Sequence, residues 1–124
     1  MKKLLLILAL LVSCLGIAQE KDNYKNAVTS FQNHYNNGDV TSIFNMFDNN
    51  FKQVLTLEKT KAYFTKEINM EALGKIKSIE YKDTVRSGNN YTITFDKGVY
   101  NGYFLLGTDN KFEFIQLDLA KKQK

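Results

Sequence analysis

The spacing of hydrophobic residues changes once along this chain, near Gly74. Before Gly74 they recur three and four positions apart, which is the period of a helix packed on one side. After it they alternate with polar residues, which is the period of a strand with one buried face. The sequence therefore predicts an α+β fold, with N-terminal helices packed on one face of an antiparallel sheet.

Three helices are expected in the first part of the chain, over 24–35, 40–47 and 57–71. Asp39 and Thr56 precede the second and third helices and are residue types that cap helix N-termini. The segment 51–55 between them is hydrophobic but of no assigned type. Each helix has one hydrophobic side, so we expect all three to cover the same face of the sheet.

Four strands are expected after Gly74, and they form a curled antiparallel sheet with neighbouring strands paired. The expected strands span 76–84, 90–96, 99–107 and 111–119. The turns between them are expected at Ser87-Gly88-Asn89, Lys97-Gly98 and Asp109-Asn110.

Turn length fixes the register of a hairpin, and therefore which side chains share a face. Two-residue turns in the second and third hairpins pair Phe95 with Tyr100, Tyr91 with Phe104, Phe104 with Ile115, and Leu106 with Glu113. The face expected under the helices then carries Tyr91, Ile93, Phe95, Tyr100, Phe104, Leu106, Ile115, Leu117 and Leu119.

The opposite, outer face mixes polar residues with large hydrophobic ones. The hydrophobic ones are Tyr103, Leu105, Phe112 and Phe114. No further helix is expected to cover them, so they form the kind of exposed patch that marks an interaction site. A homodimer is the first interpretation and a partner domain the second. The alternative is a three-residue turn at Thr108-Asp109-Asn110, which swings Phe112 and Phe114 toward the helices and removes the patch.

The N-terminus has the pattern of a cleavable secretory signal. Two lysines follow Met1, a hydrophobic run covers 4–12, and Gly16 and Ala18 suit the small −3 and −1 positions of a peptidase site, so cleavage is expected between Ala18 and Gln19. The chain then divides into a signal over 1–18, a single domain over 19–120 and a basic tail over 121–124. The apolar segment is shorter than the about 20 residues of a membrane span, so no span is expected.

Cys14 gives the signal a second interpretation. Residues 11–14 match the lipobox pattern, in which the cysteine is lipidated and becomes the new N-terminus. The hydrophobic run continues past Cys14 to Ala18, and the polar linker usual after a lipidated cysteine is missing. We therefore expect an exported bacterial protein, periplasmic or secreted, with a lipid anchor through Cys14 as the alternative.

Charge and composition exclude several kinds of partner. The formal net charge is +4, and removal of Lys2 and Lys3 with the signal lowers it to +2, part of it in the basic tail. Such a small net charge does not indicate nucleic acid or an anionic membrane surface as a binding partner. The single cysteine would also leave with the signal, which excludes a disulfide scaffold and a cysteine nucleophile.

Few residues suit catalysis or metal binding. His34 is the only histidine, lies near the end of the first expected helix, and is interpreted as a surface or capping residue rather than as a catalytic base. One histidine cannot supply a structural zinc site. Asp48-Asn49-Asn50 is interpreted as a turn, because a calcium loop would need a glutamate where the chain has Lys59. No cofactor is expected.

An acid–base site in the cone between helices and sheet is the remaining enzymatic alternative. Its candidates are Asp83 or Asp96 with Tyr63, Tyr91 or Tyr100. Asp96 leads into a turn and the tyrosines suit packing, so Tyr91 and Tyr100 are expected to line the cone without catalysing a reaction. A cone filled with side chains favours a binding domain, whereas an open cone with a buried carboxylate beside a tyrosine favours an isomerase, dehydratase or hydrolase-like enzyme.

Several short motifs resemble a known family. They are the segments 31–39, 43–47, 51–52, 74–76 and 94–98. Together, over about residues 24–118, they resemble a small exported bacterial domain of unknown function with a nuclear transport factor 2-like (cystatin-like) fold. That domain often precedes a beta-lactamase-like serine hydrolase and also occurs alone. No serine here is followed three residues later by lysine, so the acylating pair of such hydrolases is absent.

The resemblance implies an accessory role. The first hypothesis is therefore a non-catalytic binding or interaction domain of the bacterial cell envelope, accessory to an exported hydrolase. A small pocket enzyme of the same fold is the alternative. The expected partner is a protein or a second copy of the chain, with a small ligand as a further partner class and nucleic acid excluded.

Overall fold

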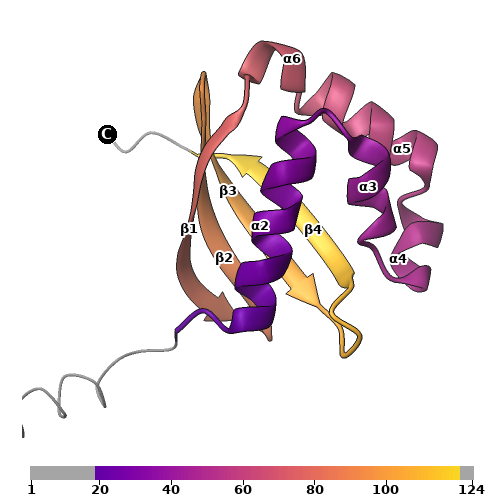
Figure 1. Cartoon of the computed structure of the whole chain (residues 1–124), viewed down its shortest axis with the longest axis vertical. Coiled ribbons are helices and arrows are strands. Elements are labelled where there is room, and N and C mark those ends of the chain that lie inside the picture. Colours follow the sequence, from indigo (N-terminus) through magenta and orange to yellow (C-terminus); the bar gives the residue numbers. More distant parts are fainter. Residues whose placement is uncertain (1–18, 121–124) are drawn as a thin grey trace, which may run out of the picture.

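The computed structural model describes residues 19–120, which form an α+β domain with a four-stranded antiparallel sheet. The expected fold class is therefore confirmed. The longest helix, α2 (Asp22–Asn36), lies across one face of the sheet, and shorter helices lie beside it toward the last strand (Figure 1). Outside the described residues lie the expected signal with Ala18 of its cleavage site, the alternative lipidation site at Cys14, and the basic tail. Gln19, the residue after the expected cleavage, is described.

The helical part contains more and shorter elements than the three expected helices. They are α2, α3 (Val40–Asn45), α4 (Asn49–Val54), α5 (Leu57–Ala62), the π-helical turn η1 (Tyr63–Glu67) and α6 (Met70–Leu73). The third expected helix is divided because Asn69 has a φ of 58°, which a right-handed helix does not allow. The side chain of Asn69 then caps α6 by accepting from the backbone N–H of Ala72. In the described part of the chain, no helix is both long and apolar enough to cross a lipid bilayer.

Side-chain caps explain where the short helices begin. The carboxylate of Asp39 accepts from the N–H of Ser42 at 3.1 Å, and the Thr56 hydroxyl accepts from the N–H of Lys59 at 3.4 Å, so both expected caps are confirmed. Asp48 does the same for α4, at 2.8 Å from the N–H of Phe51. The interpretation of residues 48–50 as a turn was therefore wrong, since they begin a helix.

The sheet has four strands in sequence order, as expected. They are β1 (Ile76–Val85), β2 (Gly88–Phe95), β3 (Gly98–Leu106) and β4 (Phe112–Leu119). The turn between β1 and β2 consists of Arg86 and Ser87, not of residues 87–89. Both have positive φ, 53° and 70°, which is the sign pattern of the type I′ turn that suits twisted hairpins.

The register between β2 and β3 differs from the expected one by two residues. The turn is Asp96-Lys97, so Phe95 pairs with Gly98. Ile93 therefore pairs with Tyr100, and Asn89 with Phe104, in place of the expected pairs. Because side chains alternate with a period of two, this shift leaves every residue on its predicted face.

The hairpin between β3 and β4 has the three-residue turn that was the alternative. The N–H of Gly107 donates to the carbonyl of Lys111 at 2.9 Å, and Asn110, the last residue of the turn, has a φ of 62°. Leu106 then pairs with Phe112 rather than with Glu113. A bulge follows at once and restores the expected pairing of Phe104 with Ile115.

This geometry moves Phe112 from the outer face to the core. Its side chain is 0 % exposed, and its ring centroid lies 5.4 Å from that of Phe104. The backbone of Phe112 also forms two hydrogen bonds on the free edge of β4. Its N–H donates to the carbonyl of Met46 at 2.8 Å, and its carbonyl accepts from the N–H of Asp48 at 2.9 Å. The expected place of Phe112 in an exposed patch was therefore wrong.

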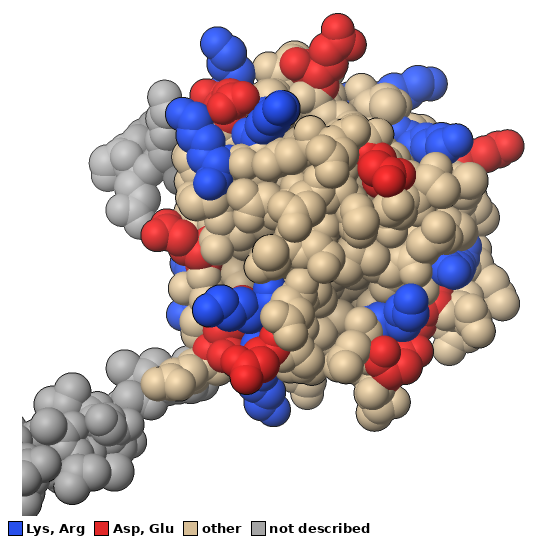
Figure 2. Space-filling model, in the orientation of Figure 1, with Lys and Arg blue, Asp and Glu red and all other residues tan. Residues whose placement is uncertain are grey.

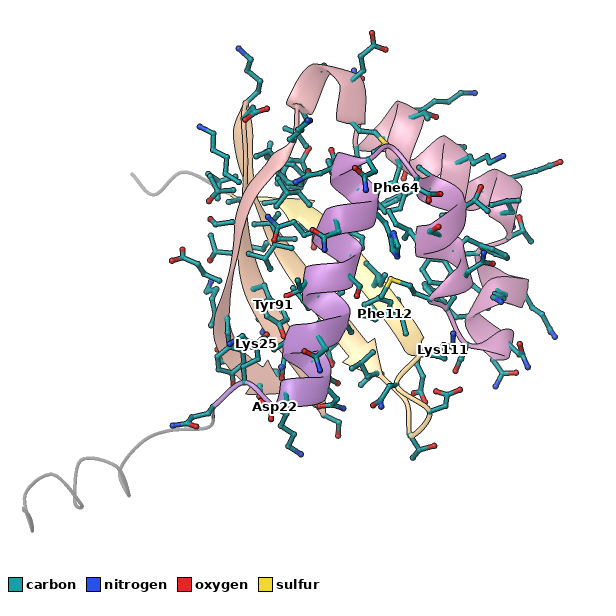
Figure 3. All side chains as sticks on the ribbon, viewed as in Figure 1. Asp22, Lys25, Phe64, Tyr91, Lys111 and Phe112 are labelled. Atoms are coloured by element: carbon teal, nitrogen blue, oxygen red, sulfur yellow. The ribbon has the colours of Figure 1, made fainter. Side chains whose placement is uncertain are left out.

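The remaining residues expected under the helices are buried or half-buried, with one exception. Leu119 is 65 % exposed, because it is the last residue of β4 and lies at the end of the sheet. Phe31 of α2 is central to the core, with ring centroids of Phe104 at 5.2 Å and Phe64 at 6.1 Å. In Figure 3, Tyr91 is seen on one side of α2, and Phe64 and Phe112 on its other side. Burial of each such ring stabilises the fold by about 1.5–3 kcal/mol.

Candidate functional site

The outer face of the sheet, turned away from α2, contains a hollow of about 390 Å³. This outer-face hollow is lined by Val85, Arg86, Asn90, Asn101, Gly102, Tyr103, Phe114, Gln116 and Asp118. The cross-strand pairs Asn90–Tyr103, Tyr103–Gln116 and Asn101–Asp118 place these polar and aromatic side chains on the same face. Its volume is within the range of small-molecule sites.

The hydroxyl end of Tyr103 is held against the first residue of β2 and the turn before it. A Cβ on Gly88 would collide with the hydroxyl and the adjoining ring carbon of Tyr103, so the ring packs directly on this glycine. The Tyr103 hydroxyl donates to the carbonyl oxygens of Val85 at 2.8 Å and of Arg86 at 3.2 Å. These contacts fix the hydroxyl end of a ring that is itself half-buried.

The adjoining turn is fixed from both faces of the sheet. Positive φ is uncommon at residues other than glycine, yet Arg86 and Ser87 both adopt it. Tyr103 binds this turn from the outer face, and the hydroxyl of Tyr24 donates to the carbonyl of Ser87 at 2.9 Å from the helix side. The glycine that the sequence suggested for the turn instead makes room for the Tyr103 ring.

Phe114 completes the aromatic part of the outer-face hollow. It is 40 % exposed, and its ring centroid lies 6.2 Å from that of Tyr103, with the two planes at 57°. Its other neighbour is Phe51 of α4, at 6.1 Å. Leu105, which pairs with Phe114, is half-buried. Of the four residues expected in the patch, Tyr103, Leu105 and Phe114 therefore share the outer face.

Neutral amides make up much of the polar lining. The Asn90 amide donates to Asp83 at 2.9 Å, and the Gln116 amide donates to Asp118 at 3.0 Å. Within the described residues, the exposed side chain of Asn101 makes no hydrogen bond to protein. The sequence did not assign Asn90, Arg86 or Gly88 to a binding site, since their places in the hollow depend on the position of the turn.

Residues 28–113 match the sequence profile of a family described as "Protein of unknown function (DUF3887)". The chain belongs to this family. The match extends from α2 to the beginning of β4 and confirms the expectation of a small domain of unknown function. No curated protein and no solved structure matches the chain significantly.

The cone of this DUF3887 domain is filled around Tyr91, which is 0 % exposed. Its ring packs against Phe104, at 5.5 Å, and its hydroxyl donates to the carboxylate of Glu20 at 2.8 Å. Burial, which disfavours the charged form, is the main reason why the pKa of Tyr91 is raised. The contact with Glu20 could not be predicted, because the two residues are far apart in the chain and Glu20 precedes every expected element.

A second hollow, of about 520 Å³, lies at the C-terminal end of α2 beside Tyr35 and Asp96. The Tyr35 hydroxyl is buried without a hydrogen-bond partner within the described residues, and burial raises the pKa of Tyr35. Tyr100 is half-buried and packs on Phe95, with the ring centroids 5.4 Å apart. Asp96 accepts from the backbone N–H of Lys75 at 2.9 Å, which holds the loop before β1.

Within residues 19–120, no hydrogen bond joins a candidate aspartate to a candidate tyrosine. Asp83 binds Asn90 on the outer face, whereas the Tyr63 hydroxyl binds the backbone of Leu117 at the β4 edge. His34 lies in the last turn of α2. No group of three or more histidine, cysteine, aspartate or glutamate side chains in residues 19–120 could hold a metal ion. On the helix-side face in Figure 2, charges of both signs lie mainly around the rim, and the centre is uncharged.

Proposed function

We propose that this DUF3887 domain is a non-catalytic binding domain of the bacterial cell envelope and that it binds through the outer-face hollow. The observation that carries the proposal is the fixed position of Tyr103, bonded to two carbonyl groups and lying beside the exposed ring of Phe114. A side chain held in place before binding loses little conformational entropy when a ligand arrives.

Other features support a location in the cell envelope and a role without catalysis. The signal pattern of the sequence favours export, and an accessory role to an exported hydrolase follows from the family resemblance. The packed interior around Tyr91 leaves no open cavity there for acid–base chemistry. The order of helices followed by a four-stranded antiparallel sheet supports the nuclear transport factor 2-like (cystatin-like) fold as part of the same proposal.

Sedimentation of the exported protein with envelope material from the producing bacterium tests this function. We expect the wild-type protein to sediment and the Tyr103→Ala/Phe114→Ala double variant to lose at least about tenfold in affinity, equal to about 1.4 kcal/mol. Leu119→Ala is the control, because Leu119 is exposed at the end of the sheet and outside the hollow. A wild-type protein that stays in solution would refute the function, and a double variant that binds normally would refute the site.

Self-association through the same face is the second candidate function. It is favoured by two large hydrophobic side chains there, Val85 at 42 % exposure and Phe114 at 40 %. A stable homodimer buries about 800 Å² on each copy. Sedimentation velocity of the exported protein and of Phe114→Lys tests this candidate: a dimer that the variant converts to a folded monomer supports it, and a monomeric wild-type protein excludes it.

A further inference from the structure

We infer that the ligand of the outer-face hollow is a neutral saccharide of the cell envelope. This inference rests on the proposed function and adds the chemical class of the ligand. It follows from three properties of the lining: its aromatic ring faces, its uncharged hydrogen-bonding groups and its balance of charge.

The aromatic rings suit the C–H groups of a sugar ring. An aromatic ring is negative on its face, and the C–H bonds of a pyranose are weakly positive, so one flat side of the sugar can stack on such a face. Phe114 offers the more exposed ring, at 40 %. The half-buried ring of Tyr103 lies beside it at 57° and is held by its hydroxyl end against Gly88.

The amides suit hydroxyl groups. A carboxamide carries both donors and an acceptor, and a sugar hydroxyl also donates and accepts, so neighbouring hydroxyls can bind one amide without a net charge on either side. Asn90 and Gln116 each use an N–H group on a carboxylate, which orients the amide. Asn101 lies between their strands, and its side chain is exposed.

Charge favours a neutral ligand. The lining contains one cationic side chain, Arg86, and one carboxylate, Asp118. A site for phosphate or for an acidic polymer would gather several cations instead. The two opposite charges can still bind polar groups at the rim, so binding is expected to depend little on salt.

The same lining is poorly suited to a protein partner. The centre of a protein interface is depleted in charged groups and forms a continuous apolar area within about 800 Å² per partner. Because Phe112 is in the core, the apolar part of this face is limited to a small group around Tyr103 and Phe114, and Asn101, Gln116 and Asp118 line the hollow beside it. This mixture of a small apolar area with polar groups is better matched by a ligand that is itself partly apolar and partly hydroxylated.

Two treatments of the envelope material identify the ligand class. Periodate cleaves the vicinal diols of sugars, and protease removes proteins. We expect wild-type sedimentation to fall at least about tenfold after periodate, which is about 1.4 kcal/mol, and to survive protease treatment. It should also persist between about 0.1 M and 1 M salt. Loss of binding after protease but not after periodate would identify a protein partner and overturn the saccharide.

Matched variants connect that result to the hollow. Asn101→Ala should weaken sedimentation with untreated envelopes about tenfold, whereas Asn33→Ala, an exposed amide on α2, should not change it. Equal effects of the two variants would overturn the inference. Failure of the saccharide inference is distinguishable from failure of the proposed function, because only the latter abolishes sedimentation of the wild-type protein with untreated material.

Discussion

Phe112 and Phe114 lie two residues apart on β4 and project to opposite faces of the sheet. In a regular strand, residues two apart share a face. Here the bulge between them inserts one extra residue, so Phe112 pairs with Leu106 and Phe114 pairs with Leu105. One ring is consequently at the centre of the core and the other is in the outer-face hollow.

This arrangement predicts very different costs for two similar substitutions. Phe112→Ala removes a fully buried ring and should lower the free energy of unfolding by about 3–5 kcal/mol. Phe114→Ala removes a ring that is 40 % exposed and should cost about 1 kcal/mol or less. Urea denaturation of both variants measures the difference. Equal destabilisation would mean that Phe114 is also a core residue and that no aromatic pair forms on the outer face.

A second prediction concerns the hydroxyl of Tyr103. Tyr103→Phe keeps the ring but removes the bonds to Val85 and Arg86, so it should lower stability by about 0.5–1.5 kcal/mol. The amides of the turn at residues 86–87 should then exchange faster with solvent. Tyr81→Phe is a matched control, because the Tyr81 hydroxyl binds Thr84 on β1 instead. Unchanged exchange in the turn of Tyr103→Phe would show that this side chain does not hold the turn.

Local sequence signals predicted the parts of the fold that depend on nearby residues. The caps at Asp39 and Thr56 and the four strands follow from propensity and period. The third expected helix was too long because Asn69 near the end of a helical pattern gives only a weak signal. A single residue with positive φ is enough to divide such a helix.

The outer-face hollow could be predicted only in part. Tyr103 and Phe114 were assigned to the correct face, but Phe112 was not. Its position depends on a three-residue turn followed by a bulge, and both are stabilised by contacts with residues 46–48, which are distant in sequence. Gly88 was assigned to a turn for a similar reason, since its packing against Tyr103 is visible only once the register is known.

A third prediction concerns the free edge of β4. The Tyr63 hydroxyl accepts from the N–H of Leu117 and donates to its carbonyl, both at 3.3 Å. It thereby provides a hydrogen-bond partner for two backbone groups of an edge strand. Tyr63→Phe should lower stability by about 1 kcal/mol. Hydrogen exchange at the Leu117 amide should accelerate more than at Gln116, which pairs with Tyr103. Equal exchange of Leu117 in wild type and variant would contradict this role.

A fourth prediction concerns the processing of the expected N-terminal signal. The Gly16/Ala18 pair and the apolar continuation beyond Cys14 predict a mature protein that begins at Gln19 and carries no lipid. The intact mass of the protein recovered from the producing bacterium measures this directly. Cys14→Ser should be processed at the same site with the same mature mass. A diacylated terminus at Cys14 would instead establish lipid anchoring.

The last prediction is a loss of stability at alkaline pH. Burial raises the pKa values of Tyr35, Tyr63 and Tyr91 in the folded protein, whereas an unfolded tyrosine ionises near pH 10. Above about pH 10 the unfolded chain therefore releases protons that the folded chain retains, and the free energy of unfolding should fall by up to about 1.4 kcal/mol per pH unit for each such group. Below about pH 9 these groups are neutral in both states and their contribution is fully present. Urea denaturation across this range should show a shallower decline for Tyr91→Phe than for wild type, because one of the three groups is gone. Identical slopes, or tyrosinate absorbance from all seven tyrosines while the protein is still folded, would contradict the buried position of these hydroxyls.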